Sequence, residues 1–324
     1  MRVTSQIRHR AAGVLLAQAC GDALGVPYEF AAPPPGEPEM LGGGLGPYAP
    51  GEWSDDTQMA ICIAQVAATG VDLTSEGALD AVAEGFLGWL GSGASDVGIQ
   101  TRSVLHAATT GSGRPAERLR AAARHHFDMG GQAAGNGALM RTGIVALSAL
   151  NDRDAAAAAA RALAELTHAD PLAGDSCVLW GEAIRVAVLE GRLDVTGGLD
   201  LIPPDRRDRW AEALTQAQEQ PPGTFARNGF TLTALQAAWA AIHTTRTGGE
   251  DAGHLPRALG AAVRVGHDTD TVAAIAGQLL GARYGVSAVP ARWRRVVHGW
   301  PGLRARDLVA LALDTVNGGG QPSP

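Results

Sequence analysis

Apolar residues recur along most of the chain at the spacing of helices, and the alternation typical of strands is almost absent. An Asn-Asp-Arg-Asp segment at 151–154 precedes an alanine run as a helix cap would, and Gly191 and Gly285 stand where helices should end. The pattern predicts a single all-α domain over residues 1–316, with helices at 6–24, 57–68, 75–90, 104–109, 114–125, 138–150, 154–167, 174–190, 206–219, 231–245, 255–265, 272–283 and 305–316.

Two segments do not fit this helical pattern. Residues 31–50 are rich in Pro and Gly, so they can form neither a helix nor a regular strand. Because they join Glu29 to an acidic segment, we interpret them as a lid over a functional site; a surface loop without function is the alternative. Residues 317–324, also rich in Gly and Pro, are expected to form a disordered tail.

Composition narrows the class of protein. The chain has 324 residues, a net charge of -7 and scattered Arg residues, so no basic stripe indicates binding to nucleic acid or to an anionic membrane. Its three Cys residues lie far apart in apolar segments, which favours free thiols in a reducing compartment. No apolar run reaches the roughly twenty residues needed to span a membrane. We therefore expect a cytoplasmic protein.

Two acidic clusters indicate the chemistry. The sequences Ser-Asp-Asp-Thr at 54–57 and Asp-Thr-Asp-Thr at 268–271 each place two carboxylates next to a predicted helix. Crowded carboxylates repel each other unless a cation lies between them. Oxygen ligands suit hard ions such as Mg²⁺ and Mn²⁺. If the fold brings the clusters together, they predict a two-metal site; ordinary capping of the following helices is the alternative.

The second acidic cluster has a geometry of its own. Side chains two positions apart point the same way in an extended turn, which would let Asp268 and Asp270 converge. Gly266 permits an unusual backbone angle before this turn. The apolar face of the following helix would anchor the turn in the core.

Both clusters belong to a longer series of motifs. In chain order these are Gly-Asp-Ala-Leu-Gly at 21–25 with Glu29, then residues 53–59, 96–98 with 101–102, 135–141, 167–168, 233–239 and 266–277. In this order they resemble the ADP-ribosylglycohydrolase family, which includes the dinitrogenase reductase-activating glycohydrolases. The resemblance spans nearly the whole chain.

The resemblance implies an orthogonally packed, all-α fold with a binuclear Mg²⁺ or Mn²⁺ centre. It also implies hydrolysis of the N- or O-glycosidic bond at C1 of the distal ribose of ADP-ribose, attached to a protein, a nucleic acid or a small conjugate. A monomer is expected on the same basis. The implied metal ligands are Ser54, Asp55, Asp56, Asp268, Asp270 and Thr271.

Catalytic roles follow from the same resemblance. Glu29 matches a glutamate that closes over the metals, and we interpret it as an acid, a base or a gate. Asp55, Asp56 and Asp270, together with Asp268, are candidates for accepting the proton of a water molecule activated by the metals. Ser54 replaces a threonine of most relatives and keeps the hydroxyl group.

Substrate contacts are implied at six positions. Residues 135–137 precede a predicted helix, whose backbone N–H groups could bind an anion, although any helix start can look similar. His267 stands where most relatives have Gly, so it either contacts the substrate or is solvated. Arg141 is expected to form an ion pair or to bind phosphate. The positions are Asp96, Gly135, Asn136, Gly137, His168 and His267.

Three other functions fit parts of this pattern. Another two-metal hydrolase, such as a phosphohydrolase, would use the same acidic clusters. A non-catalytic ADP-ribose-binding or sensing module would use the metals only to hold its ligand. A purely structural helical protein would need both clusters to be helix caps. The sequence does not decide which ADP-ribosyl linkage is cut.

Overall fold

The protein is described by a computed structural model that covers residues 3–130, 133–247, 251 and 253–318. Within these residues the chain forms fourteen α-helices: α1 (Ser5–Gly25), α2 (Asp55–Ala67), α3 (Glu76–Gly91), α4 (Ile99–Ala108), α5 (Pro115–Asp128), α6 (Val145–Ser148), α7 (Arg153–Ala164), α8 (Pro171–Glu190), α9 (Pro204–Glu219), α10 (Thr231–Thr244), α11 (His254–Val263), α12 (Thr269–Tyr284), α13 (Ala291–Val296) and α14 (Ala305–Val316). Short 3₁₀ helices are η1 (Val26–Tyr28), η2 (Leu139–Arg141), η3 (Leu199–Leu201), η4 (Pro222–Phe225) and η5 (Val286–Ala288). Strands β1 (His298–Gly299) and β2 (Leu303–Arg304) pair antiparallel.

The predicted all-α fold is confirmed, and so are the caps. Asp152 caps α7 by accepting bonds from two backbone N–H groups, and Gly191 and Gly285 end α8 and α12 with positive φ angles. The small hairpin and α13 were not predicted. Residues 319–324 of the predicted tail lie outside the described residues, whereas Asn317 accepts a hydrogen bond of 2.9 Å from Arg8.

One predicted helix, over residues 138–150, is wrong. The segment instead forms η2 and the four-residue α6, separated by a break at Gly143. The carbonyl group of Met140 is turned away from the chain to accept hydrogen bonds from Gln18 and Gln278. A side chain at Gly143 would also overlap Gln278, whose Cγ would lie 2.7 Å from an added Cβ. Tertiary contacts therefore override the local helical pattern.

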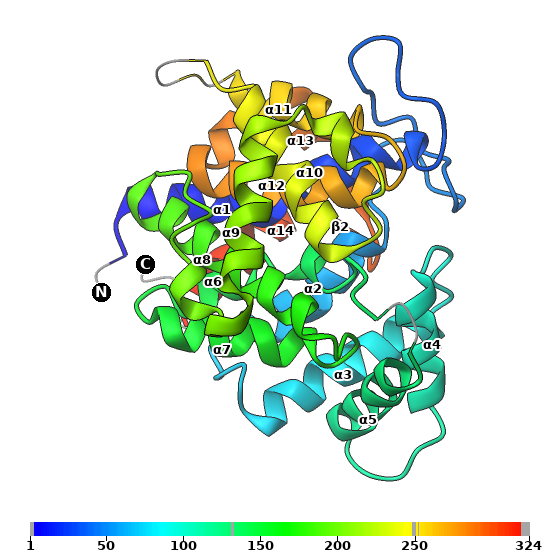
Figure 1. Ribbon diagram of the computed structural model, residues 1–324. Helices are drawn as coiled ribbons and strands as arrows, with labels where there is room; N and C mark the ends of the chain where they lie inside the picture. Colours follow the sequence, from blue (N-terminus) through cyan, green and yellow to red (C-terminus); the bar gives the residue numbers. More distant parts are fainter. Residues whose placement is uncertain (1–2, 131–132, 248–250, 252, 319–324) are drawn as a thin grey trace.

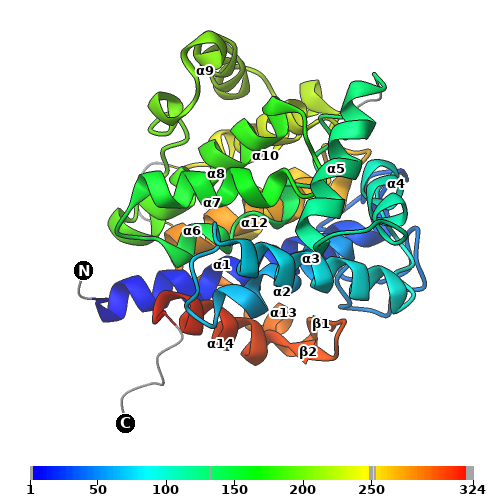
Figure 2. The same ribbon diagram turned by 90° about the horizontal axis from the view of Figure 1, so that it is seen from below.

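Helices α1 and α12 run antiparallel through the middle of the molecule (Figures 1 and 2). Nearly all their residues are buried, so they lack a polar face, as is typical of a central helix. Around them pack α2, α8, α10, α11 and α14. Helices α3, α4 and α5 form a separate group at one side of the molecule.

Glycines allow α1 and α12 to touch through their backbones. An added Cβ at Gly277 of α12 would lie 2.7 Å from the carbonyl carbon of Ala17 in α1 and would overlap its oxygen. A Cβ at Gly21 would lie 2.6 Å from the carbonyl carbon of Ala273, and one at Gly25 would overlap the backbone of Asp270. The carboxyl end of α1 is therefore held against the amino end of α12.

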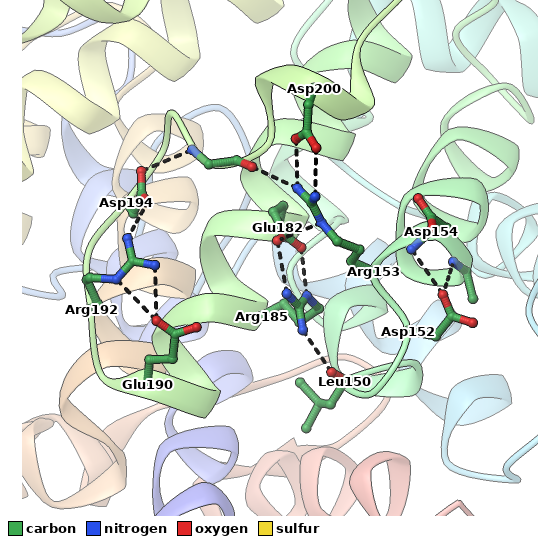
Figure 3. A network of polar contacts seen from close by, with 12 residues as sticks. Leu150, Asp152, Arg153, Asp154, Glu182, Arg185, Glu190, Arg192, Asp194 and Asp200 are labelled. Atoms are coloured by element: carbon green, nitrogen blue, oxygen red, sulfur yellow. Dashed lines mark hydrogen bonds and ion pairs between the residues drawn. The ribbon is translucent and has the colours of Figure 1, made fainter. Parts of the chain in front are cut away.

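A polar network on the surface joins α7, α8 and η3 (Figure 3). Arg153 forms ion pairs with Glu182 at 3.2 Å and with Asp200 at 2.7 Å. Glu182 also pairs with Arg185, which in turn donates to the carbonyl group of Leu150. The network lies on helices that pack against the central pair, and none of its residues belongs to the acidic clusters. We interpret it as structural.

The loop over residues 31–50 contains no helix and no named strand, as predicted. It is fastened to α11 by Arg264, which donates to the carbonyl group of Gly36 at 2.8 Å and pairs with Glu37. Tyr48 is buried near Asp55 and Asp96, so the loop reaches the acidic region. None of the described helices has the length and apolar character required to cross a membrane.

The backbone contact between α1 and α12 can be tested with Gly277→Ala. The added methyl group has no room, so we expect the free energy of unfolding to fall by about 2–3 kcal/mol. The control is Gly88→Ala, because Gly88 is exposed in α3 and an added Cβ there meets nothing within 4 Å. The control should gain up to about 1 kcal/mol. Urea unfolding of both variants measures this; equal stabilities would contradict the packing argument.

Candidate active site

The two acidic clusters meet where α2 and α12 begin. Asp55 and Asp56 lie in the first turn of α2, and Asp270 lies in the first turn of α12, next to its N-cap Asp268. Carboxylate oxygens of Asp56 and Asp270 lie within 4.8 Å of each other, and so do those of Asp268 and Asp270. The fold therefore brings the clusters together, as the two-metal prediction requires.

Asp22 of α1 joins this group, although the sequence analysis assigned it no role. One oxygen accepts from the backbone N–H of Ser54 at 2.8 Å and from its hydroxyl at 2.7 Å. The other accepts from the backbone N–H of Thr57 at 3.0 Å and from its hydroxyl at 2.6 Å. Asp22 thus caps α2 from a different helix. Ser54, the formal N-cap, makes no capping bond and can point toward Asp56 and Asp270.

The cluster suits a hard cation. Asp56 is completely buried, and its Oδ1 has no hydrogen-bond donor within the described residues. No Arg within the described part of the chain pairs with Asp22, Asp56 or Asp270, and after burial the pKa values of Asp56 and Asp270 are shifted mainly by other carboxylates. All available ligand atoms are oxygens, as Mg²⁺ and Mn²⁺ prefer. A buried acidic group without a counter-charge is costly unless a cation binds it.

Burial and mutual repulsion raise the pKa values of these carboxyl groups. Burial, followed by repulsion from neighbouring carboxylates, raises the pKa of Asp55, Asp56 and Asp270 well above the ordinary value. Burial raises the pKa of Asp22 to about 6. Its four hydrogen bonds favour the charged form and therefore oppose this rise. Burial and then repulsion from Asp96 raise the pKa of Glu29 to about 9.

Glu29 lies over the cluster from the end of η1. Its carboxylate oxygen is within 4.8 Å of those of Asp268 and Asp270, and its carboxyl group hydrogen-bonds that of Asp96. The next residue, Phe30, donates its backbone N–H to the carbonyl group of His267 at 2.7 Å. The rings of Phe30 and His267 meet edge to face, with centroids 6.5 Å apart.

Phe30 and His267 both adopt left-handed backbone angles, with φ values of 48° and 59°. Such angles are uncommon for residues with a side chain and store strain. They flank Glu29 and Asp268, so the strained turns carry a candidate catalytic residue and a candidate metal ligand. His267 itself is exposed, and within the described residues its side chain makes no hydrogen bond or ion pair with the carboxylates. A contact with substrate stays a prediction.

The loop over residues 135–137 is tied directly to the acidic cluster. Asn136 donates from its side chain to Asp268 at 2.7 Å and to the carbonyl group of Asn228 at 2.9 Å. The Asn228 amide oxygen accepts the backbone N–H of Asp268 at 3.1 Å. Gly135 pairs with Phe230 in an isolated antiparallel bridge. This loop therefore adjoins the acidic cluster, although it precedes the short η2 rather than a long helix; its contact with substrate stays a prediction.

His168 lies beside the same loop. An added Cβ at Gly135 would lie 3.3 Å from its Nε2, and one at Gly137 would lie 3.1 Å from its Cε1. The two glycines therefore let the loop approach this ring more closely than residues with a side chain could. His168 is almost completely buried, and burial lowers its pKa well below the ordinary value, helped by Arg141. The ring is neutral near pH 7.

Most predicted site residues lie together, with three differences. Asp55 is close to Asp96 and Asp268 but belongs to neither of the tight carboxylate groups. Helices α2 and α12 begin earlier than predicted, so Asp270 is helical and does not sit in an extended turn. Arg141 forms no ion pair within the described residues and is not exposed to a ligand. Its side chain is buried against the ring of Phe86.

Two functional positions were missed. Asp22 lies within the motif at residues 21–25, and its signal was a carboxylate in the apolar second half of a predicted helix. A charged residue in such a helix must have partners, which points to a role. Asn228 is completely buried and carried no signal of this kind, because Asn before Gly is an ordinary turn sequence.

Comparison with known proteins agrees with this arrangement. The sequence profile of the ADP-ribosylglycohydrolases matches residues 4–322. An ADP-ribosylarginine hydrolase of Pseudomonas putida is 29% identical over 89% of this chain and 74% of its own length. An ADP-ribosyl-[dinitrogen reductase] glycohydrolase of Rhodospirillum rubrum is 28% identical over 89% and 90%. A solved ADP-ribosylglycohydrolase-related protein complex gives a TM-score of 0.72 at 28% identity, over 98% of this chain and 100% of that chain.

The helical fold and the matched relatives define an enzyme that hydrolyses glycosidic bonds. The chain belongs to the ADP-ribosylglycohydrolase family, whose members hydrolyse the bond between ADP-ribose and another group. The resemblance noted in the sequence is thereby confirmed. The profile match over residues 4–322 also explains why the motifs occur in one order along the whole chain.

The role of Asp22 can be tested with Asp22→Asn. Each Asp22 oxygen accepts from the backbone N–H and the hydroxyl of one residue, Ser54 or Thr57. An amide has one acceptor oxygen, so its NH₂ group would replace one of these acceptors. The N–H and O–H groups of that residue would then be buried without an acceptor. We expect the free energy of unfolding to fall by about 2–4 kcal/mol. The control is Asp152→Asn, because Asn caps a helix as well as Asp does. Equal urea midpoints for both variants would exclude the capping role.

The raised carboxyl pKa values predict a pH dependence of stability. Unfolded carboxyl groups titrate near about pH 4, whereas Asp22 and Glu29 titrate at about 6 and about 9 in the folded protein. The folded protein therefore binds more protons between these values, so its stability should fall as the pH rises. We expect thermal unfolding in EDTA to show this fall between about pH 5 and about pH 9. Added Mg²⁺ should reduce it, and a rise with pH in EDTA would contradict the electrostatic description.

Proposed function

We propose that this protein is a divalent-cation-dependent hydrolase that removes ADP-ribose from arginine side chains of proteins, and that it uses two Mg²⁺ or Mn²⁺ ions. The observation that carries the proposal is the set of buried carboxylates at the starts of α2 and α12, which have one another as neighbours in place of basic partners. An acidic centre of this kind needs a cation to be charged at neutral pH.

The proposed ligands come from the starts of two helices, α2 and α12. Oδ1 of Asp56 accepts no hydrogen bond from the described residues. A carboxylate oxygen of Asp270 lies within 4.8 Å of those of both Asp56 and Asp268. Asp22 uses both oxygens for hydrogen bonds, so it orients its neighbours more than it offers a free ligand atom. The full set is Ser54, Asp55, Asp56, Asp268, Asp270 and Thr271. When bound, such cations polarise ribose hydroxyl groups and lower the pKa of a coordinated water molecule.

Glu29 and Asp96 are proposed to handle the proton of the leaving group. Without cations, burial and repulsion raise the pKa of Glu29 to about 9, and Asp96 is its hydrogen-bond partner. To keep this proton in the loaded centre, Glu29 must be shielded from the charge of the cations. Glycoside hydrolysis needs a proton for the departing atom and a base for the attacking water, because C1 gains positive charge in the transition state. Glu29 supplies the first, and the carboxylates of Asp55, Asp56 or Asp270 supply the second.

Arginine is the proposed acceptor for two reasons. Two of the similar curated proteins are named ADP-ribosylarginine hydrolases. A guanidinium group is also cationic and planar, so it suits the carboxylate of Asp96, to which protonated Glu29 donates a hydrogen bond. Serine hydroxyls and nucleic-acid bases lack this charge. Release of ADP-ribose from those substrates in preference to arginine would overturn the assignment of the acceptor.

The test is calorimetric titration of ADP-ribose, first with Mg²⁺ and then with EDTA, followed by an assay of ADP-ribosylated arginine peptide. We expect binding and ADP-ribose release only with the cation. Asp270→Asn should lower release on the order of 100-fold or more. The control Asp208→Asn, on the exposed face of α9, should match the parent protein. Cation-dependent binding without turnover would point to a sensing module, and release of inorganic phosphate to a phosphohydrolase.

A further inference from the structure

Thr167 connects two buried side chains that the proposed mechanism leaves unexplained. Its hydroxyl oxygen lies 2.7 Å from an Nη2 donor of Arg141 and 2.7 Å from Nδ1 of His168. All three residues are buried, with exposed fractions of 1%, 0% and 1% for Arg141, Thr167 and His168. The line of contacts runs from the end of η2 to the ring that faces the residue 135–137 loop.

Arg141 is a buried cation without a carboxylate partner among the described residues. It donates to the carbonyl group of Leu163 at 3.3 Å and to the Thr167 hydroxyl, and it stacks 4.5 Å from the ring of Phe86. Burial lowers its pKa to about 10, so it stays charged near neutral pH. A buried arginine that supports only packing would be costly.

The protons of this line can be assigned from the donors present. A guanidinium group can only donate, so Thr167 accepts from Arg141. The hydroxyl proton of Thr167 then needs an acceptor, and within the described residues Nδ1 of His168 is the one in reach. If Nδ1 carried a proton, that hydroxyl would be buried with no acceptor, which is unfavourable. A neutral imidazole whose Nδ1 accepts must carry its proton on Nε2.

We infer that Arg141 and Thr167 are positioning residues that hold His168 in its Nε2–H tautomer, so that the ring presents one hydrogen-bond donor to the ligand loop at residues 135–137. Within the described part of the chain, the hydrogen bond between Nδ1 and Thr167 is the one that the ring makes, so Nε2 stays available to a ligand. The lowered pKa of His168 agrees with a neutral ring. The identity of the ligand rests on the proposed function.

The surroundings of Nε2 define what it recognises. Gly135 and Gly137 pack closely against the ring, and a Cβ added at either would lie 3.1–3.3 Å from His168, Thr101 Oγ1 or Gln100 Oε1. A group that fits must offer an acceptor oxygen to the Nε2–H, and ADP-ribose carries such oxygens on its diphosphate and on its distal ribose. A histidine in the other tautomer would turn a lone pair toward these oxygens and repel them.

The tautomer can be measured in the protein without ligand or turnover. Long-range ¹H–¹⁵N correlation spectra distinguish a protonated from an unprotonated ring nitrogen, and His168→Gln identifies the signal. We expect Nε2 protonated and Nδ1 unprotonated in the parent protein. In Thr167→Val, which has the same shape without the hydroxyl, this preference should be lost; Thr167→Ser should restore it. A protonated Nδ1 in the parent, or an unchanged spectrum in Thr167→Val, overturns the inference.

Binding provides the second readout. We expect Thr167→Val to weaken ADP-ribose binding about 10-fold, and Thr167→Ser to bind like the parent. Gln places its NH₂ near the position of Nε2 and Asn near that of Nδ1, so His168→Gln should bind more tightly than His168→Asn. Equal losses in these two variants overturn the donor role. Titration of ADP in parallel distinguishes two contacts. If His168 binds the diphosphate, the variants lose affinity for both ADP and ADP-ribose; if it binds the distal ribose, they lose affinity for ADP-ribose alone.

These measurements separate the inference from the proposed hydrolysis. The tautomer is read from the free protein, so it stands or falls whatever linkage the enzyme cuts. Unfolding midpoints of Thr167→Val and Thr167→Ser report whether packing alone explains a loss of binding. A correct tautomer in a protein that fails to release ADP-ribose from arginine would contradict the proposed substrate and leave the positioning role intact.

Discussion

The contact between the backbones of α1 and α12 is the constraint on which the site depends. Because Gly21, Gly25 and Gly277 have no Cβ, the two helices approach until one chain touches the other. This approach sets Asp22 of α1 beside Asp270 of α12, which no side-chain packing at ordinary helix spacing would do. Asp22 then positions the start of α2 through four hydrogen bonds. Three helices distant in sequence thereby share one acidic centre.

Hydrogen bonds, and not ion pairs, arrange the carboxylates. Asn136 and Asn228 hold Asp268, while the hydroxyl groups of Ser54 and Thr57 hold Asp22. Neutral donors orient a carboxylate without cancelling its charge, so the negative potential stays available to a ligand. Arg141 also acts through a neutral group: the cation orients the neutral His168 ring through the Thr167 hydroxyl.

The sequence predicts the elements of this fold better than their contacts. Helical periodicity located most helices, and two Asp-rich segments located the acidic centre, because those signals are local. The break at Gly143 and the early start of α12 depend on Gln278 and on α1, which lie far away in sequence. Asp22 was overlooked for the same reason: its partners, Ser54 and Thr57, become visible only when α1 and α2 are in place.

The stiffness of this arrangement has a consequence for ion choice. Two asparagines hold Asp268, and the first turn of α12 holds Asp270. Oxygens held this way cannot retreat to admit a larger ion. Mg²⁺ requires oxygens at about 2.0–2.1 Å, whereas Ca²⁺ requires about 2.3–2.6 Å. In the proposed centre, the close glycine contact between α1 and α12 therefore favours a small ion such as Mg²⁺ over Ca²⁺.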